Sequence, residues 1–193
     1  MKKLETRKLV LGALMAALVV ILQYMGSFVR FGPFSISLVL IPIVIGAITC
    51  GKEIGAFLGL IFGIMVFVTG DAALFLAVNA PGTIITVILK GVLCGYLTGL
   101  FYELILKVSK KKYLSAVISA VICPVVNTGV FLTGCYFFFL ETVTEWGIAA
   151  GFGSNVGAYM IFGLVGANFL VELGFNVIFA PAIVHILKAT DKN

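Results

Sequence analysis

Two ionisable side chains, Lys90 and Glu172, lie well inside long apolar segments of the chain. A single charge at the centre of a membrane-spanning helix costs at least about 2.5 kcal/mol on insertion scales, so such residues usually pair or face a cavity. Three interpretations stay open on these residues alone. Either they form a structural ion pair with each other, or Lys90 binds an anionic group of a ligand; a role in proton coupling is a third.

Side-chain amides accumulate around the same segments. A single asparagine in a membrane bundle usually only hydrogen-bonds between helices. Taken together, however, these amides fall in the halves of their segments that face one side, with Gln23 near the matching end of the first segment. This asymmetry predicts a polar pocket open to that side. The asparagines are Asn79, Asn127, Asn155, Asn168 and Asn176.

Six apolar segments have to position these side chains. About 20 apolar residues span a bilayer as a helix, and 193 residues hold six such helices with little left over. The composition agrees, because 62% of the residues are hydrophobic, 11% are charged and the mean hydropathy is +1.22. We expect an all-α membrane protein of six transmembrane helices, with residues 1–193 forming a single integral membrane domain. The segments are 9–28, 34–50, 53–70, 82–106, 113–140 and 159–187.

The positive charges predict the orientation of these helices. Eleven of the 13 lysines and arginines precede the first segment or follow the second, fourth and sixth, and the other connections carry mainly acidic residues. Cationic loops stay in the cytoplasm during insertion, so both termini are expected there, in a multi-pass protein of a bacterial cell membrane. The net charge of +5 then suits the anionic inner leaflet of the lipid bilayer, and no nucleic-acid partner is expected.

Two outer connections are candidate covers for the pocket. Residues 29–37 contain Arg30, and residues 141–158 contain Trp146 among several glycines. Glycine permits large backbone changes, so a mobile lid over a ligand fits this composition. An interfacial segment with Trp146 anchored among lipid headgroups fits it equally well.

The sequence carries no residue set suited to catalysis or metal binding. Its four cysteines lack CxxC spacing and His185 is the only histidine, so we expect neither a metal nor a cofactor. The patterns HExxH, GxSG and GxxxxGK[ST] are absent, which argues against an intramembrane enzyme and against an intrinsic ATPase.

Small residues recur every four positions in three of the segments, a spacing that lets helices approach closely. In the third and fourth segments this spacing predicts packing within the bundle. In the first segment, packing within the bundle and contact with another subunit both remain open. The repeats are Gly51, Gly55, Gly59 and Gly63, then Gly91, Gly95 and Gly99, and in the first segment Gly12 with Ala16 and Ala13 with Ala17.

From about residue 7 to residue 188, the chain resembles the substrate-binding (S) subunits of energy-coupling-factor (ECF) vitamin transporters. The resemblance is carried by LGALMAALVVIL, LVLIPIVIGAITCGKEIGAFLGLIFGI, NAPGTIITVILKGVLCGYLTGLFY and ISAVICPVVNTGVFLTG. It implies a subunit that binds a vitamin near the outer surface and does not itself hydrolyse ATP. It also implies two kinds of partner: a shared transmembrane coupling subunit and two cytoplasmic ATPase subunits. The coupling subunit would dock on an AxxxA-type motif, matched by Ala13 and Ala17, with Gly12 and Ala16 beside it.

Two stretches, GTIITVILKG and CPVVNTGVF, look most like the pantothenate branch of that family. Pantothenate is a small anion with hydroxyl groups and an amide, which suits a lysine or arginine among asparagines. Binding of folate or riboflavin stays an alternative, as does a non-transporting membrane scaffold. A self-sufficient secondary transporter is disfavoured because the chain lacks a repeated pair of broken helices. The expected ligand-binding residues are Lys90, Asn127, Asn168, Asn79, Arg30, Trp146, Asn155 and Glu172.

Overall fold

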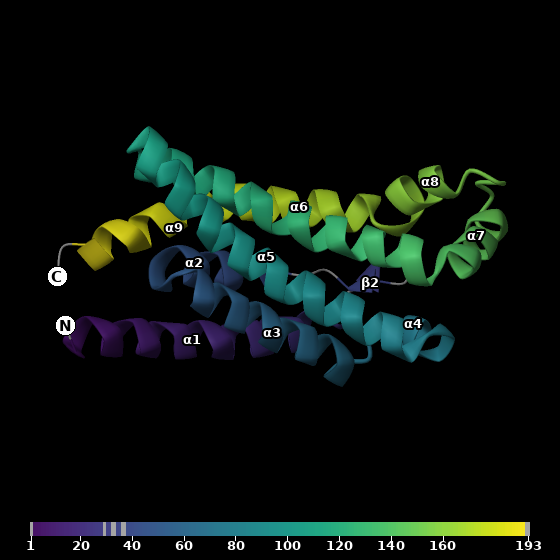
Figure 1. Ribbon diagram of the computed structural model, residues 1–193, viewed down its shortest axis with the longest axis horizontal. Helices are drawn as coiled ribbons and strands as arrows, with labels where there is room; N and C mark the ends of the chain where they lie inside the picture. Colours follow the sequence, from purple (N-terminus) through teal and green to yellow (C-terminus); the bar gives the residue numbers. More distant parts are fainter. Residues whose placement is uncertain (1, 29, 32–33, 36–37, 192–193) are drawn as a thin grey trace.

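The computed structural model is an elongated bundle of helices (Figure 1). It describes the backbone of residues 2–28, 30–31, 34–35 and 38–191, and the side chains of residues 6–28 and 38–179. Within these residues, β structure is limited to one antiparallel pair of two-residue strands, β1 (Arg30–Phe31) and β2 (Phe34–Ser35). The expectation of a helical protein is therefore confirmed.

Every expected apolar segment contains a helix, and the last one is bent. Two short helices, α4 (Ala73–Val78) and α7 (Leu140–Ala149), lie in the connections on either side of the α5–α6 pair. The bundle helices are α1 (Lys2–Gly26), α2 (Leu40–Cys50), α3 (Lys52–Val68), α5 (Ala80–Ser109), α6 (Lys112–Phe138), and α8 (Val156–Ala158) continuing through the π-helical turn η1 (Tyr159–Leu164) to α9 (Gly166–Asp191).

Helix length separates these elements into two groups. In the described part of the chain, three helices are long and apolar enough to cross a membrane: Thr6–Gly26, Ala80–Ser109 and Lys112–Phe138. A fourth span results when Val156–Leu164 and Gly166–Phe179, which meet at 47°, are taken as one broken helix. Helix α2 has 11 residues, or about 17 Å at 1.5 Å per residue, against a hydrocarbon core of about 30 Å.

The second segment differs from the expected range of 34–50. Its helix begins only at Leu40, because Phe34 and Ser35 pair with β1 instead of continuing α2. The connection 141–158, expected as a loop, is also helical over its first part, where it contributes most of α7.

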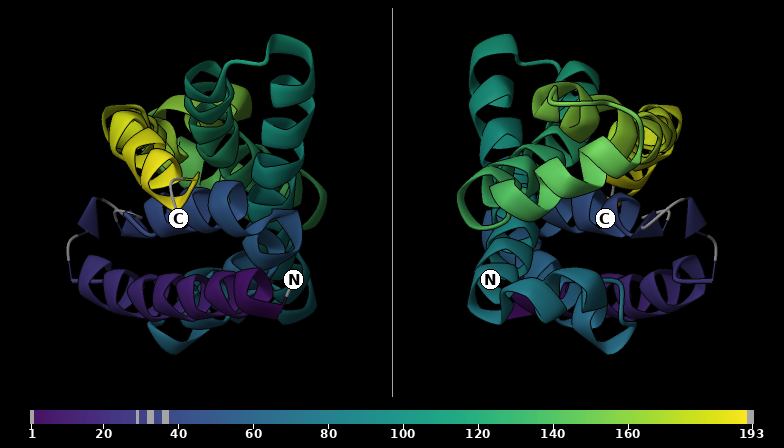
Figure 2. Two further views of the ribbon diagram at one scale, coloured as in Figure 1. Left: turned by 90° about the vertical axis from the view of Figure 1, so that its left-hand side faces the viewer. Right: turned by 90° about the vertical axis from the view of Figure 1, so that its right-hand side faces the viewer.

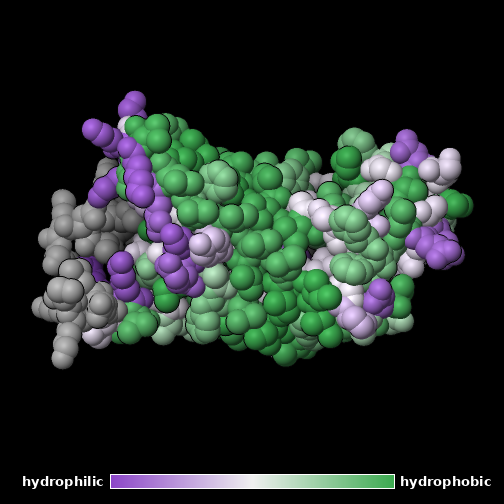
Figure 3. Space-filling view, viewed as in Figure 1, coloured by the Kyte–Doolittle hydropathy of each residue, from purple (hydrophilic) through white to green (hydrophobic). Residues whose placement is uncertain are grey.

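The surface of the bundle divides into an apolar middle and two polar ends. Hydrophobic residues cover the middle in the view of Figure 3, and hydrophilic residues gather at both ends of the long axis. The start of α1, the end of α9 and the connection between α5 and α6 share one end, whereas α4 and α7 lie at the other (Figure 1). An apolar belt between polar ends is the surface expected of a protein embedded in a bilayer.

Inside the bundle, α2 packs between α1 and α9, as the views along the long axis show (Figure 2). Helices α3 and α5 approach each other most closely, because their glycines face one another. A Cβ atom at Gly55 would lie 2.5 Å from the carbonyl oxygen of Gly95, and Gly59 and Gly91 oppose each other in the same way. The glycine repeats of these two helices therefore serve packing within the bundle.

Candidate ligand-binding site

A cavity of about 70 Å³ lies between α1, α3, α5, α6 and α9, near the end of the bundle that carries α4. At about 30 Å³ per water molecule in the liquid, it has room for roughly two waters. A larger ligand therefore requires lining side chains or covering segments to move outward. The lining residues are Gln23, Phe62, Val66, Asp71, Ala72, Phe75, Thr83, Thr86, Val87, Lys90, Asn127, Thr128, Phe131, Phe139, Val165, Asn168 and Glu172.

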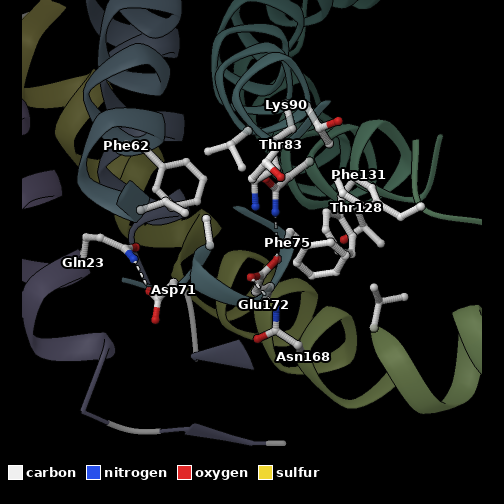
Figure 4. A pocket seen from close by; sticks show the side chains of 17 residues that line it. Gln23, Phe62, Asp71, Phe75, Thr83, Lys90, Thr128, Phe131, Asn168 and Glu172 are labelled. Atoms are coloured by element: carbon white, nitrogen blue, oxygen red, sulfur yellow. Dashed lines mark hydrogen bonds between the residues drawn. The ribbon is translucent and has the colours of Figure 1, made fainter. Parts of the chain in front are cut away.

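Lys90 reaches the cavity from α5 (Figure 4). Among the described side chains, its ammonium makes its contacts with two aromatic rings. Nζ lies 5.3 Å from the ring centre of Phe62 on α3 and 5.5 Å from that of Phe131 on α6. Both distances are within the range of a cation–π attraction, which is strengthened when the cation is shielded from water. The carboxylate of Glu172 lines the same cavity.

Glu172 is 1% exposed and accepts hydrogen bonds from neighbouring amides. Its Oε1 accepts from Nδ2 of Asn168 at 2.9 Å, one helical turn earlier on α9. Its Oε2 accepts from Nδ2 of Asn127 on α6 at 3.4 Å, and its backbone oxygen accepts from Asn176. These contacts hold a buried carboxylate in the wall of the cavity and connect α6 with α9.

Two polar atoms of the cavity wall have no hydrogen-bond partner among the described residues. They are Oδ1 of Asn127 and Oγ1 of Thr86, whose residues are 5% and 4% exposed. A buried polar atom without a partner is costly, and nearly all such atoms in folded proteins are satisfied. Oδ1 of Asn127 can only accept a hydrogen bond, whereas the hydroxyl of Thr86 can accept or donate, so the wall offers hydrogen-bonding groups close to a cation.

A second polar group connects α1 with the end of α3. Nε2 of Gln23 donates to Oδ2 of Asp71 at 2.7 Å, and Oγ1 of Thr69 donates to the same oxygen at 3.1 Å. Gln23 and Asp71 both line the cavity, and their hydrogen bond is visible in Figure 4. This pair fastens α1 over one side of the cavity.

The structure brings four of the expected ligand-binding residues together in this cavity: Lys90, Asn127, Asn168 and Glu172. Two others cap helices. Oδ1 of Asn79 accepts from the backbone N–H of Gly82 at 2.9 Å, and Oδ1 of Asn155 accepts from that of Ala158 at 3.0 Å. Their carbonyl oxygens are thus used at the starts of α5 and α8.

The remaining two expected residues belong to the connections. Trp146 lies on α7 and packs behind the cavity wall, with its ring centre 5.4 Å from that of Phe75. Arg30 is part of β1, and its side chain lies outside the described residues.

Several lining residues were not singled out from the sequence. Thr83, Thr86 and Lys90 follow one another at spacings of three and four on α5, so they share one helix face. Such a polar stripe on an apolar helix could have identified these cavity residues from the sequence. The aromatic lining residues gave no such signal, because phenylalanine is equally frequent on lipid-facing surfaces of such a chain.

The small residues of α1 fall on two different faces. Gly12 is buried, and a Cβ atom there would lie 3.2 Å from Cγ2 of Ile54 on α3, while Ala16 packs against the core. Ala13 and Ala17 are exposed on the outside of the bundle. Of the two small-residue pairs, therefore, one packs inward and the other lies on the surface.

The fold and the cavity define a helical membrane protein with an internal cavity lined by a cation and by hydrogen-bonding groups. Residues 7–184 match the family of ECF transporter substrate-specific components, and the chain belongs to this family. It is thus a component of a membrane transporter, and the family is not one of enzymes.

One relative covers the chain completely. The pantothenic acid transporter PanT of Lactococcus lactis subsp. cremoris (strain MG1363) is 28% identical to it over 210 aligned positions, which span 100% of both proteins. No solved structure matches the chain significantly.

Proposed function

We propose that this protein captures pantothenate at the outer face of a bacterial cell membrane and delivers it to an ATP-driven import machinery. The observation that carries the proposal is the position of Lys90, whose ammonium lies in a buried cavity beside unpartnered hydrogen-bond acceptors. The carboxylate of pantothenate would contact Lys90, and its hydroxyl groups and amide N–H would donate to Asn127 and Thr86. The full-length similarity to PanT supports this choice of ligand.

In this proposal the chain crosses the membrane six times. The spans are α1, α2, α3, α5, α6 and the bent pair that ends in α9, with α2 and α3 crossing as short or tilted helices. The charge distribution supports cytoplasmic termini, since Lys107 and Lys110–Lys112 lie at the α5–α6 connection, whereas Glu141 and Glu145 lie on α7 at the other end. The cavity then lies in the outer half of the membrane.

The proposed partners are a transmembrane coupling subunit and two cytoplasmic ATPase subunits, which supply the energy. The exposed face of α1 at Ala13 and Ala17 is the proposed contact with the coupling subunit, because two alanines four residues apart let another helix approach closely. Gly12 and Ala16 would support that face from the inside, where they fit α1 to the bundle.

The segments around the outer end are the proposed covers of the cavity. Trp146 packs on Phe75, which itself lines the cavity, so a movement of α7 would reach the cavity wall. Asn155 and Asn79 would act through the helix starts that they cap, and Arg30 through the β1–β2 segment. Opening and closing of such segments would admit a ligand larger than the present cavity.

Isothermal titration of the purified protein in detergent with pantothenate, folate and riboflavin tests the ligand assignment. We expect saturable binding of one pantothenate per chain and no comparable heat from the other two. Tight binding of folate or riboflavin would keep the proposed transport role and replace its ligand. No binding of any vitamin would favour a membrane scaffold.

A further inference from the structure

The carboxylate of Glu172 determines how the amides around it are turned. An ionised carboxylate can only accept hydrogen bonds, whereas an asparagine amide can either donate through Nδ2 or accept through Oδ1. Nδ2 of Asn168 donates to Oε1, and Nδ2 of Asn127 donates to Oε2. Turning either amide around would place an amide oxygen against a carboxylate oxygen in a buried site, which is unfavourable.

This arrangement leaves the carbonyl end of Asn127 for another partner. Its Oδ1 is buried, belongs to a residue of the cavity wall and has no hydrogen-bond partner among the described residues. Oγ1 of Thr86 in the same wall is in the same situation. The site therefore combines the cation Lys90 with a hydroxyl that can accept or donate and with an amide oxygen, Oδ1 of Asn127, that requires a donor group on the ligand.

We propose that Glu172 is a positioning residue that makes the site selective for ligands that carry a hydroxyl donor in addition to their anionic group. It acts by holding Asn127 with Oδ1 available to the ligand, and it need not touch the ligand itself. This inference rests on the proposed function and names the hydrogen-bond donor by which the site recognises its ligand.

The isosteric variant Glu172→Gln separates positioning from simple packing. Glutamine presents one acceptor and one donor, so it can accept from Asn168 or from Asn127 but not from both. The contact of Asn127 is the longer one, at 3.4 Å against 2.9 Å for Asn168, so Asn127 is the amide expected to turn. It would then offer Nδ2 to the ligand where Oδ1 was available before. The size of the side chain and the packing of α9 remain nearly unchanged.

The experiment measures Kd for pantothenate and for its dideoxy analogue, in which hydrogen atoms replace both hydroxyl groups, on the purified full-length protein. We expect the wild-type protein to prefer pantothenate by at least about tenfold, and the Glu172→Gln variant to lose most of this preference. The matched control is Glu103→Gln, which makes the same substitution on α5 near the end that lies away from the cavity. This variant should keep the preference for pantothenate. Both ligands carry the same carboxylate, so their ratio is independent of changes in the contact with Lys90.

Two further variants make the test decisive. In Glu172→Gln/Asn127→Asp the carboxylate and the amide exchange places, and the preference should return because position 127 again offers an oxygen. If Glu172→Gln does not fold, Asn127→Leu removes the same acceptor and should abolish the preference. A ratio that stays at the wild-type value in Glu172→Gln, or in Asn127→Leu, overturns the inference. Wild-type protein that binds neither compound overturns the proposed function together with it.

Discussion

Lys90 on α5 and Glu172 on α9 line one cavity, and each is held by a different set of neighbours. Aromatic rings from α3 and α6 surround the ammonium, and amides from α6 and α9 donate to the carboxylate. The contact with these rings helps to keep a lysine in the interior of an apolar bundle. It does not use the hydrogen-bonding capacity of the ammonium, which remains suited to an anionic ligand.

Replacement of Lys90 by methionine should weaken pantothenate binding while the protein stays folded. Methionine keeps much of the apolar stem but removes the charge, and a hydrogen bond to a charged group contributes about 1.5–3 kcal/mol, or roughly 10- to 150-fold in affinity. Titration calorimetry measures the loss. The control is Lys107→Met, which makes the same change at an exposed position of the same helix. Unchanged affinity in Lys90→Met would show that Lys90 does not bind the carboxylate.

The exposed face of α1 should be required for transport but not for ligand binding. Ala13→Trp places a large ring where the proposed coupling subunit would approach, so uptake should fall to background when all subunits are co-expressed. Pantothenate affinity of the purified variant should equal that of the wild type. Leu18→Trp, exposed on a different side of the same helix, should transport normally. Normal uptake by Ala13→Trp would exclude this face as the docking surface.

The contact between α3 and α5 should tolerate no side chain at its glycines. In Gly59→Ala the new methyl group would overlap the carbonyl group of Gly91, so the helices must separate. Overpacking of this kind costs typically about 1–3 kcal/mol and should lower the Tm of the detergent-purified protein. Gly129→Ala on α6 is the control, because a Cβ atom there meets nothing within 4 Å. Equal Tm values for the two variants would contradict the close approach of α3 and α5.

The proposed orientation predicts opposite labelling at the two ends of the bundle. Glu145→Cys on α7 should react with a membrane-impermeant maleimide in intact cells, and Lys111→Cys at the start of α6 only after the membrane is permeabilised. Both positions are exposed, and the four native cysteines are buried, so background labelling should be low. Labelling of Lys111→Cys in intact cells would reverse the assigned topology.

Much of the cavity was predictable because polar residues are rare in this chain. Lys90 and Glu172 stand out in apolar segments, and Asn127 and Asn168 lie at similar depths, so their convergence followed from the expected topology. The hydroxyl groups of Thr83 and Thr86 were overlooked, since threonine in a membrane helix commonly bonds its own backbone, as Thr83 also does here.

The helix starts were harder to predict. Asn79 and Asn155 each precede a helix, the position where asparagine most often caps the free N–H groups, and the structure shows both of them in this role. Hydropathy predicts too early a start for α2, because residues 34–39 are largely apolar. The β pairing of Phe34 and Ser35 depends on a partner outside the segment. Hydropathy alone does not distinguish these conformations.

The most direct test of the account identifies the ligand that the protein retains. Cells supplied with a mixture of vitamins would express the full-length protein, and mass spectrometry would quantify the small molecules released from it after purification in mild detergent. The account predicts close to one pantothenate per chain, and a strongly reduced amount in Lys90→Met purified in parallel. A different vitamin at stoichiometric amount, or equal pantothenate in both proteins, would contradict it.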